Sequence, residues 1–246
     1  MDVAPPNPVE NAHLQTVLKL EAMDTIGIPD AINHATIIHN QMLKALRNFH
    51  DLYMAQPSVA PAHENASPGA QDLLRAMLLF ACSGLDAVVK QLIEDALEAV
   101  LKHDPGAQRE FQKFVERRLK RNSSSDENER GTLDIALLSQ LLLSFDVRSQ
   151  LIGTLRYSLS SDSLQSRDQI LKVAAHFAIT RDDIMASPDD TKGAFDARNQ
   201  IVHEMDIQLD NGDQRRVRDY PSMAALCENV AAISARFIGT VATKLG

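Results

Sequence analysis

Arg198 and His203 lie five residues apart in the segment 196–204, and Asn199 directly follows the arginine. Histidine titrates near neutral pH, so its imidazole can take a proton from one oxygen or give a proton to another. The guanidinium of arginine carries a permanent charge and a fork of donors that fits the oxygens of a phosphoryl group. RNA cleavage without a metal can use both kinds of group. The 2′-hydroxyl must lose a proton and the leaving 5′-oxygen must gain one, while negative charge accumulates on the phosphoryl oxygens.

The spacing of this pair bears on how a site would be completed. Residues five apart on an ideal α-helix point in directions about 140° apart around the axis, so Arg198 and His203 are not expected to share a face. Two copies related by a two-fold axis could line a shared cleft, since a C2 interface presents every residue twice. The sequence therefore predicts a homodimer, formed through the helix that carries the pair and through a long central helix.

The long central helix is predicted from about residue 70 to about residue 102. Its middle, residues 78–85, is apolar on nearly every face, which places it in the centre of the fold or of an interface. Within that stretch, Ser83–Gly84 offers a small patch where another helix can approach closely. The sequence Asp104-Pro105-Gly106 predicts the end of the element.

Shorter patterns complete the predicted architecture, an all-α helical bundle rich in Ala and Leu. Pro29 is expected to open a helix, and residues 188–190 to precede the helix with the Arg–His pair. Residues 210–213 predict a turn, within either a short β-hairpin near residues 207–218 or a polar loop. Residues 1–28 are expected to form an N-terminal extension with a first helix, and residues 29–246 one helical domain. Further helices are expected at residues 14–20, 133–145, 170–177 and 221–244, and loops at residues 56–69 and 122–129.

The charge balance limits how the chain could contact RNA. It has 25 basic and 33 acidic residues, a net charge of −8, whereas a protein that binds many phosphates needs a basic surface. Any contact with RNA must therefore be local. Two basic clusters exist, each of which taken alone is typical of a solvated face: Arg117, Arg118, Lys120 and Arg121, and Arg215, Arg216 and Arg218.

Cys82 and Cys227 are the only cysteines, and both lie in apolar, helical stretches, so two buried thiols are expected. The N-terminus lacks the basic and apolar regions of a signal peptide. We expect no apolar run that spans a bilayer, and hence a cytoplasmic protein without membrane contact. No phosphate-binding loop of familiar spacing and no clustered metal ligands are visible, so neither a cofactor nor a metal is expected.

At this point a family resemblance becomes visible. The segment 198–203, Arg-Asn-Gln-Ile-Val-His, resembles the Arg–polar–x–x–x–His signature of HEPN domains. The segment 82–88 is similar to the "Ser-x-Leu-Asp-Ala" helix of the RiboL-PSP-HEPN subgroup, and the two motifs occur in the order and separation of that subgroup. The resemblance covers about residues 30–245. It implies a dimeric helical bundle and a metal-independent ribonuclease of a toxin–antitoxin, CRISPR or anti-phage system.

The resemblance also implies residue roles. Arg198 would bind and polarise the scissile phosphate, His203 would act as general base or acid, and Asn199 would position the phosphate or the histidine. Asp86 could orient the arginine or histidine from the long helix, or could equally be a helix-surface or capping carboxylate. Glu204 and Asp206 are expected to be solvated.

Other interpretations stay open. HEPN toxins that are silenced by nucleotidyl transfer carry a tyrosine two residues after the histidine, where this chain has Met205, which argues against that form of control. The chain could be a catalytically inactive HEPN-like module that binds nucleotides or proteins. It could also be a toxin whose cleft is covered by an antitoxin or another defence-system partner.

Overall fold

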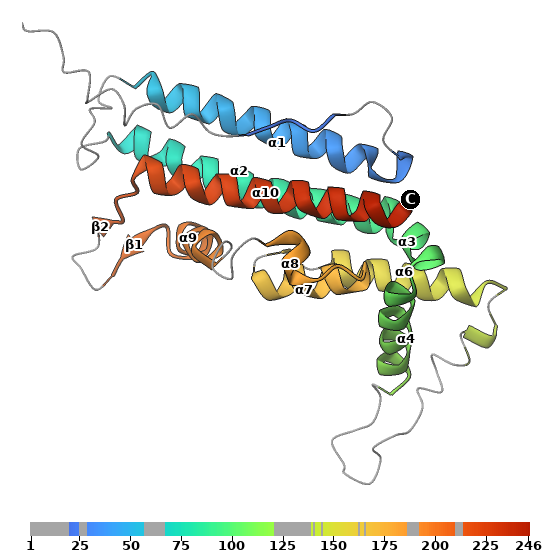
Figure 1. The fold of residues 1–246 in the computed structure, drawn as a ribbon. Coiled ribbons are helices and arrows are strands. Elements are labelled where there is room, and N and C mark those ends of the chain that lie inside the picture. The colour runs from blue at the N-terminus through green and yellow to red at the C-terminus, as the bar shows by residue number, and fades with distance from the viewer. Residues whose placement is uncertain are drawn as a thin grey trace, which may run out of the picture.

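The computed structural model describes residues 20–24, 29–56, 67–120, 139, 141–143, 145–161, 163–164, 166–185, 192–209 and 214–246. The described chain is an all-α bundle with one small hairpin, as predicted (Figure 1). Its elements are α1 (Asp30–Met54), α2 (Pro68–Asp95), α3 (Leu97–His103), α4 (Pro105–Leu119), α6 (Val147–Ser160), α7 (Arg167–His176), α8 (Arg181–Ile184), α9 (Lys192–His203), β1 (Ile207–Gln208), β2 (Gln214–Arg215) and α10 (Tyr220–Leu245).

The three longest helices, α1, α2 and α10, run side by side and form the core (Figure 1). Helix α2 packs against α1, α10, α9 and α6, and its Leu78, Leu85 and Leu92 are fully buried. The sequence allowed the apolar middle of α2 to lie at the centre of the fold or of an interface. In the structure it lies at the centre of the fold.

Helix α1 approaches α2 closely at the predicted small patch. A Cβ atom added to Gly84 would lie 2.9 Å from the Cβ of Met42 in α1, which is closer than real Cβ atoms come. The absence of a side chain at residue 84 is what allows this approach. The neighbour that uses the patch is thus a helix of the same chain.

The predicted helix of residues 70–102 is interrupted at Ala96, and this part of the prediction is wrong. Ala96 has φ −108° and is fully buried, and it separates α2 from α3. Asp104 then ends α3 as predicted and caps α4, because its carboxylate accepts hydrogen bonds from Gly106 and Ala107 at 2.7 and 2.9 Å. The other oxygen of Asp104 pairs with Lys244 at 2.8 Å, which ties this corner to α10.

A second group of helices covers one side of the core. Helices α8 and α9 pack on α10, α9 and α6 pack on α2, and α4 extends away beside α3 and α7 (Figure 1). Strands β1 and β2 pair antiparallel with Ile207 opposite Arg215, at the end of the bundle where α9 finishes. The hairpin predicted near residues 207–218 is confirmed, with strands of two residues each.

Several predictions fall outside the described residues: the helix at residues 14–20 except Leu20, the loop at residues 122–129, most of the helix at residues 133–145, the helix signal at residues 188–190 and the turn at residues 210–213. Of the extension, residues 20–24 lie against α1, where Met23 and Asn40 exchange two hydrogen bonds of 2.9 Å. Cys82 and Cys227 are buried and free, as expected.

Helices α2 and α10 are long and apolar enough, by length and composition alone, to cross a bilayer. The expectation that no apolar run reaches that length is therefore wrong. Half of the most apolar window of each helix is buried inside the bundle, where the two helices pack on each other. A core helix meets the same criteria, so this finding assigns no compartment.

Candidate active site

Helix α9 brings the Arg–His pair together at its exposed end. The Nη1 atom of Arg198 lies 3.0 Å from Oδ1 of Asn199 and 3.4 Å from Nε2 of His203. Arg198 and Asn199 are half-buried, and His203 is exposed as the last residue of the helix. The expectation that the two side chains would not share a face is wrong, because the long arginine side chain reaches around the helix to the imidazole.

Packing of the opposite side of α9 fixes where Arg198 can lie. Phe195, Ala197 and Ile201 are buried, and α9 packs on α2 and α10. Arg198 consequently lies close enough to Cys82 of α2 to lower the pKa of that thiol, although burial has the larger effect and raises the pKa to about 12. The guanidinium is therefore fixed near the core while its partner His203 faces solvent.

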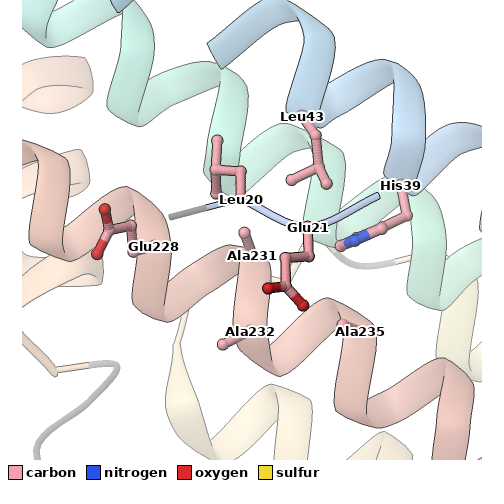
Figure 2. Close-up of a pocket in the computed structure, with 8 residues that line it drawn as sticks. All are labelled: Leu20, Glu21, His39, Leu43, Glu228, Ala231, Ala232 and Ala235. Atoms are coloured by element: carbon pink, nitrogen blue, oxygen red, sulfur yellow. The ribbon is translucent and has the colours of Figure 1, made fainter. Parts of the chain in front are cut away.

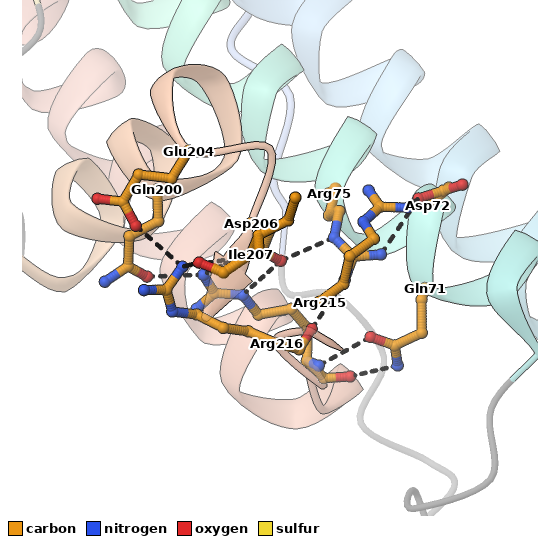
Figure 3. A network of polar contacts seen from close by, with 10 residues as sticks. Gln71, Asp72, Arg75, Gln200, Glu204, Asp206, Ile207, Arg215 and Arg216 are labelled. Carbon is orange, nitrogen blue, oxygen red and sulfur yellow. Dashed lines mark hydrogen bonds and ion pairs between the residues drawn. The ribbon is translucent and has the colours of Figure 1, made fainter. Parts of the chain in front are cut away.

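The chain just after His203 is held by a buried carboxylate. Asp206 is fully buried and accepts a hydrogen bond from Nε of Arg75 at 2.7 Å (Figure 3). It accepts a second one from Nη2 of Arg218 at 2.5 Å. Met205 and Asp206 have φ of 53° and 60°, which turns the chain back so that the N–H of Asp206 donates to the carbonyl of Gln200 at 2.8 Å. The expectation of a solvated Asp206 is wrong, since its carboxylate is buried and is paired with two arginines.

Arg75 is the second buried centre of this network. Only 4% of Arg75 is exposed, and besides Asp206 it donates to the carbonyl of Arg216 at 2.7 Å and to Asp72 at 3.1 Å. Gln71 exchanges two hydrogen bonds of 2.8 Å with the backbone of Arg218. The network joins α2 to Asp206, just after α9, and to residues 215–218, and it therefore fixes the C-terminal end of the helix that carries Arg198 and His203.

The same network neutralises the second basic cluster. Arg215 pairs with Asp72 at 2.7 Å, Arg216 with the exposed Glu204 at 3.0 Å, and Arg218 with Asp206. Burial alone would raise the pKa of Asp206, but hydrogen bonds from Arg218 and Arg75 outweigh it and hold that pKa below its usual value. These arginines therefore serve to position α9 and do not form a free cationic surface.

Asp86 lies elsewhere. Its carboxylate accepts a hydrogen bond of 2.8 Å from the N–H of Leu164 and pairs with Lys90 at 2.9 Å. These contacts fix the segment that leads into α7, and neither of them involves Arg198 or His203. The structure thus brings together Arg198, Asn199 and His203, and it places the contacts of Asp86 outside that group.

Two cavities lie at different distances from the Arg–His pair along the fold. One of about 290 Å³ adjoins it through Asn199 and lies between α9 and the start of α7; it is lined by Ser166, Arg167, Asp168, Lys192, Phe195, Asp196 and Asn199. The other, of about 210 Å³, lies between α1, α10 and residues 20–24 and has no residue of α9 (Figure 2). Only the first could hold a group that reaches the Arg–His pair.

His39 is one of the residues that line the cavity in Figure 2, and it is almost fully buried. Its Nδ1 lies 3.0 Å from Oγ of Ser234, and its Nε2 has no hydrogen-bond partner in the described part of the chain. Burial lowers the pKa of His39 to about 4. The imidazole is therefore neutral at pH 7, and Glu21 and Glu228 belong to the same lining.

Among the residues that the structure describes, no group of three or more His, Cys, Asp or Glu side chains is placed to share a metal ion. Comparisons with protein-family models, with curated proteins and with solved structures found no match. The site is accordingly characterised by its own geometry, which is an exposed Arg–His contact on a helix whose end is fixed by a buried ion pair.

Proposed function

We propose that the protein is an endoribonuclease that cleaves RNA by attack of the 2′-hydroxyl on the adjacent phosphate. The observation that supports this most is the contact of Arg198 Nη1 with His203 Nε2 at the exposed end of α9. In the proposed reaction the 2′-oxygen forms a bond to phosphorus and the bond to the 5′-oxygen breaks. The products are a 2′,3′-cyclic phosphate and a 5′-hydroxyl.

Each residue has a role that its chemistry allows. A neutral His203 imidazole takes the proton of the 2′-hydroxyl as general base, and a protonated one gives a proton to the leaving 5′-oxygen. The Arg198 guanidinium binds the non-bridging oxygens and stabilises the charge that develops on them, and Asn199 holds the guanidinium through their 3.0 Å hydrogen bond. The cavity beside Asn199 offers room for a neighbouring nucleotide.

One subunit presents one imidazole, whereas the reaction needs both a base and an acid. A two-fold dimer would place two copies of the pair at one cleft. Val202 and Met205 flank His203 and are apolar, with 42% and 64% of each exposed, so they are the surface that such a dimer would cover. The biological setting that fits this activity is phage defence or a toxin–antitoxin system, with a partner protein that controls the cleft.

The test is cleavage of a labelled RNA in EDTA by the wild type and by Arg198→Ala and His203→Ala. We expect both substitutions to lower the rate by about 10²-fold or more, and wild-type products that carry a cyclic phosphate. Arg148→Ala and His103→Ala are matched controls, because both residues are exposed and lie on other helices, α6 and α3.

Equal cleavage by all five proteins would remove the pair from the mechanism. A wild-type protein that binds nucleotides without cleaving RNA would favour an inactive HEPN-like module instead.

A further inference from the structure

A cavity of about 300 Å³ lies between α4, α6 and α7, and none of its lining residues belongs to the Arg198–His203 site. Its lining combines three cations, two neutral hydrogen-bonding groups and three apolar side chains, and it has no acidic residue: Arg117, Arg118, Lys172, Ser158, His176, Phe114, Leu155 and Leu159. Pockets of this size, with an apolar floor and a few polar groups, are typical of small-ligand sites.

Two lining residues have polar atoms without a partner. Nε of Arg118 and Nδ1 of His176 are buried and make no hydrogen bond in the described part of the chain. Only 4% of His176 is exposed. Buried polar groups without a partner are costly and uncommon, so the lining has hydrogen-bonding capacity that a ligand can use.

The charge around the cavity is positive. Glu110 is the carboxylate that acts on His176, and it already pairs with Lys113 at 2.7 Å. Burial lowers the pKa of His176 to about 4, with a smaller opposite effect from Glu110. The imidazole is therefore neutral at pH 7, and the positive charge comes from Arg117, Arg118 and Lys172.

We propose that this cavity binds an organic phosphate monoester, of the nucleoside monophosphate class. The phosphate group, which carries a charge near −2 at neutral pH, meets Arg117, Arg118 and Lys172, and the organic part lies against Phe114 and the two leucines. The site is separate from the proposed nuclease site and does not depend on it, since this cavity shares no lining residue with Arg198, His203 or the cavity beside Asn199.

The experiment is calorimetric titration of the full-length protein with adenosine 5′-monophosphate. We expect saturable binding that is tighter than binding of inorganic phosphate, because the apolar floor adds contact area. We expect at least about tenfold weaker binding of adenosine and of a deoxyadenosine dinucleotide without a terminal phosphate. The deoxy probe has no 2′-hydroxyl, so the proposed nuclease cannot cleave it.

Variants locate the binding. Arg118→Gln and Lys172→Gln should each weaken binding by about tenfold or more, and Lys172 is exposed, so its substitution leaves the core intact. Lys102→Gln removes the same charge from an exposed residue of α3 outside the cavity, and it should bind as the wild type does. Arg198→Ala should also bind normally, which separates this proposal from the nuclease.

Four results would overturn the proposal. These are no binding of the monophosphate by the wild type, equal weakening by Lys102→Gln, loss of binding in Arg198→Ala, or equal affinity for the deoxy dinucleotide. The third result would place the ligand at the Arg–His site, and the fourth would indicate recognition of a nucleic-acid backbone.

Discussion

Asp206 shows how much of the candidate site depends on a residue that does no chemistry. Its carboxylate has no exposed surface and is shared by Arg75 and Arg218. Removing one member of a buried ion pair leaves an uncompensated charge in the interior, which costs about 3–5 kcal/mol. The geometry of Arg198 and His203 therefore depends on a group that lies out of reach of any substrate.

Asp206→Ala should lower the free energy of unfolding by about 3 kcal/mol or more, measured by urea denaturation at pH 7. Glu204→Ala is the matched control, because Glu204 is an exposed carboxylate whose pairing with Arg216 is worth at most about 1 kcal/mol. The pKa of Asp206 is lowered in the fold, so its contribution is present at neutral pH and is lost as the pH falls below about 4. Similar losses for the two variants would contradict the role assigned to Asp206.

Two buried histidines predict a different pH window. Burial lowers the pKa of His39 and of His176 from 6.5 to about 4. Between these values the unfolded chain binds protons that the folded chain does not, so stability falls as the pH drops from about 6.5 to about 4, by up to about 3 kcal/mol for each histidine. The free energy of unfolding at pH 7 and pH 5 should differ less in His39→Leu than in the wild type, whereas exposed His103→Leu should keep the wild-type difference.

The sequence predicted the residues of the site only as far as local spacing could. Arg198, Asn199 and His203 lie on one helix, but their spacing predicted that Arg198 and His203 would not share a face, and the 3.4 Å contact depends on the conformation of the long arginine side chain. The burial of Asp206 was not predictable in this way, because its partner Arg75 is 131 positions earlier in the chain. Asp86 was misleading for the same reason, since its contact with Leu164 depends on how α6 and α7 pack.

At the scale of elements, helix boundaries followed the residues that begin or end helices by their own chemistry. Asp104 and Pro105 were predicted to end one helix, and they also begin the next. The break at Ala96 was not predicted, because alanine is the strongest helix former. Helix α6 was not predicted at all, although Asp146 caps it through a hydrogen bond to Ser149.

The contact of α1 with α2 can be tested at Gly84. Gly84→Ala would gain up to about 1 kcal/mol of helix propensity, but the new methyl group meets Met42 down to its Cβ, and overpacking of this kind costs about 1–3 kcal/mol. We expect a net loss of about 1 kcal/mol in thermal or urea unfolding. Gly153→Ala in α6 has nothing within 4 Å of the added Cβ, so it should be neutral or stabilising, and a stabilised Gly84→Ala would contradict the close approach.

At the scale of the whole molecule, assembly decides whether one Arg–His pair or two face an RNA strand. We expect the wild type to have twice the 27.1 kDa mass of one chain in light scattering after gel filtration. Val202→Glu places a charge on the apolar surface beside His203 and should give monomers with reduced cleavage. Tyr157→Glu, an exposed aromatic residue on α6, should stay dimeric; a wild-type monomer with full activity would rule out the shared cleft.

The net charge of −8 also acts on the whole molecule. With arginines 215, 216 and 218 paired to carboxylates, the basic cluster nearest to the Arg–His pair is not free to hold a long RNA. Cleavage should therefore depend only weakly on salt between 50 and 200 mM, because affinity falls steeply with salt only when many phosphates are contacted. A slope typical of six or more phosphate contacts would indicate a second RNA-binding surface.

The contacts of Asp206 determine when, during synthesis of the chain, the end of α9 can reach its final position. Arg75 is synthesised 131 positions before this carboxylate, and Arg218 is synthesised 12 positions after it. A nascent chain whose hairpin is still inside the ribosomal tunnel would therefore hold Arg75 and the end of α9 unattached. The Arg–His pair would reach its final geometry only after residues 206–218 have left the tunnel, because Asp206 can then pair with both Arg75 and Arg218.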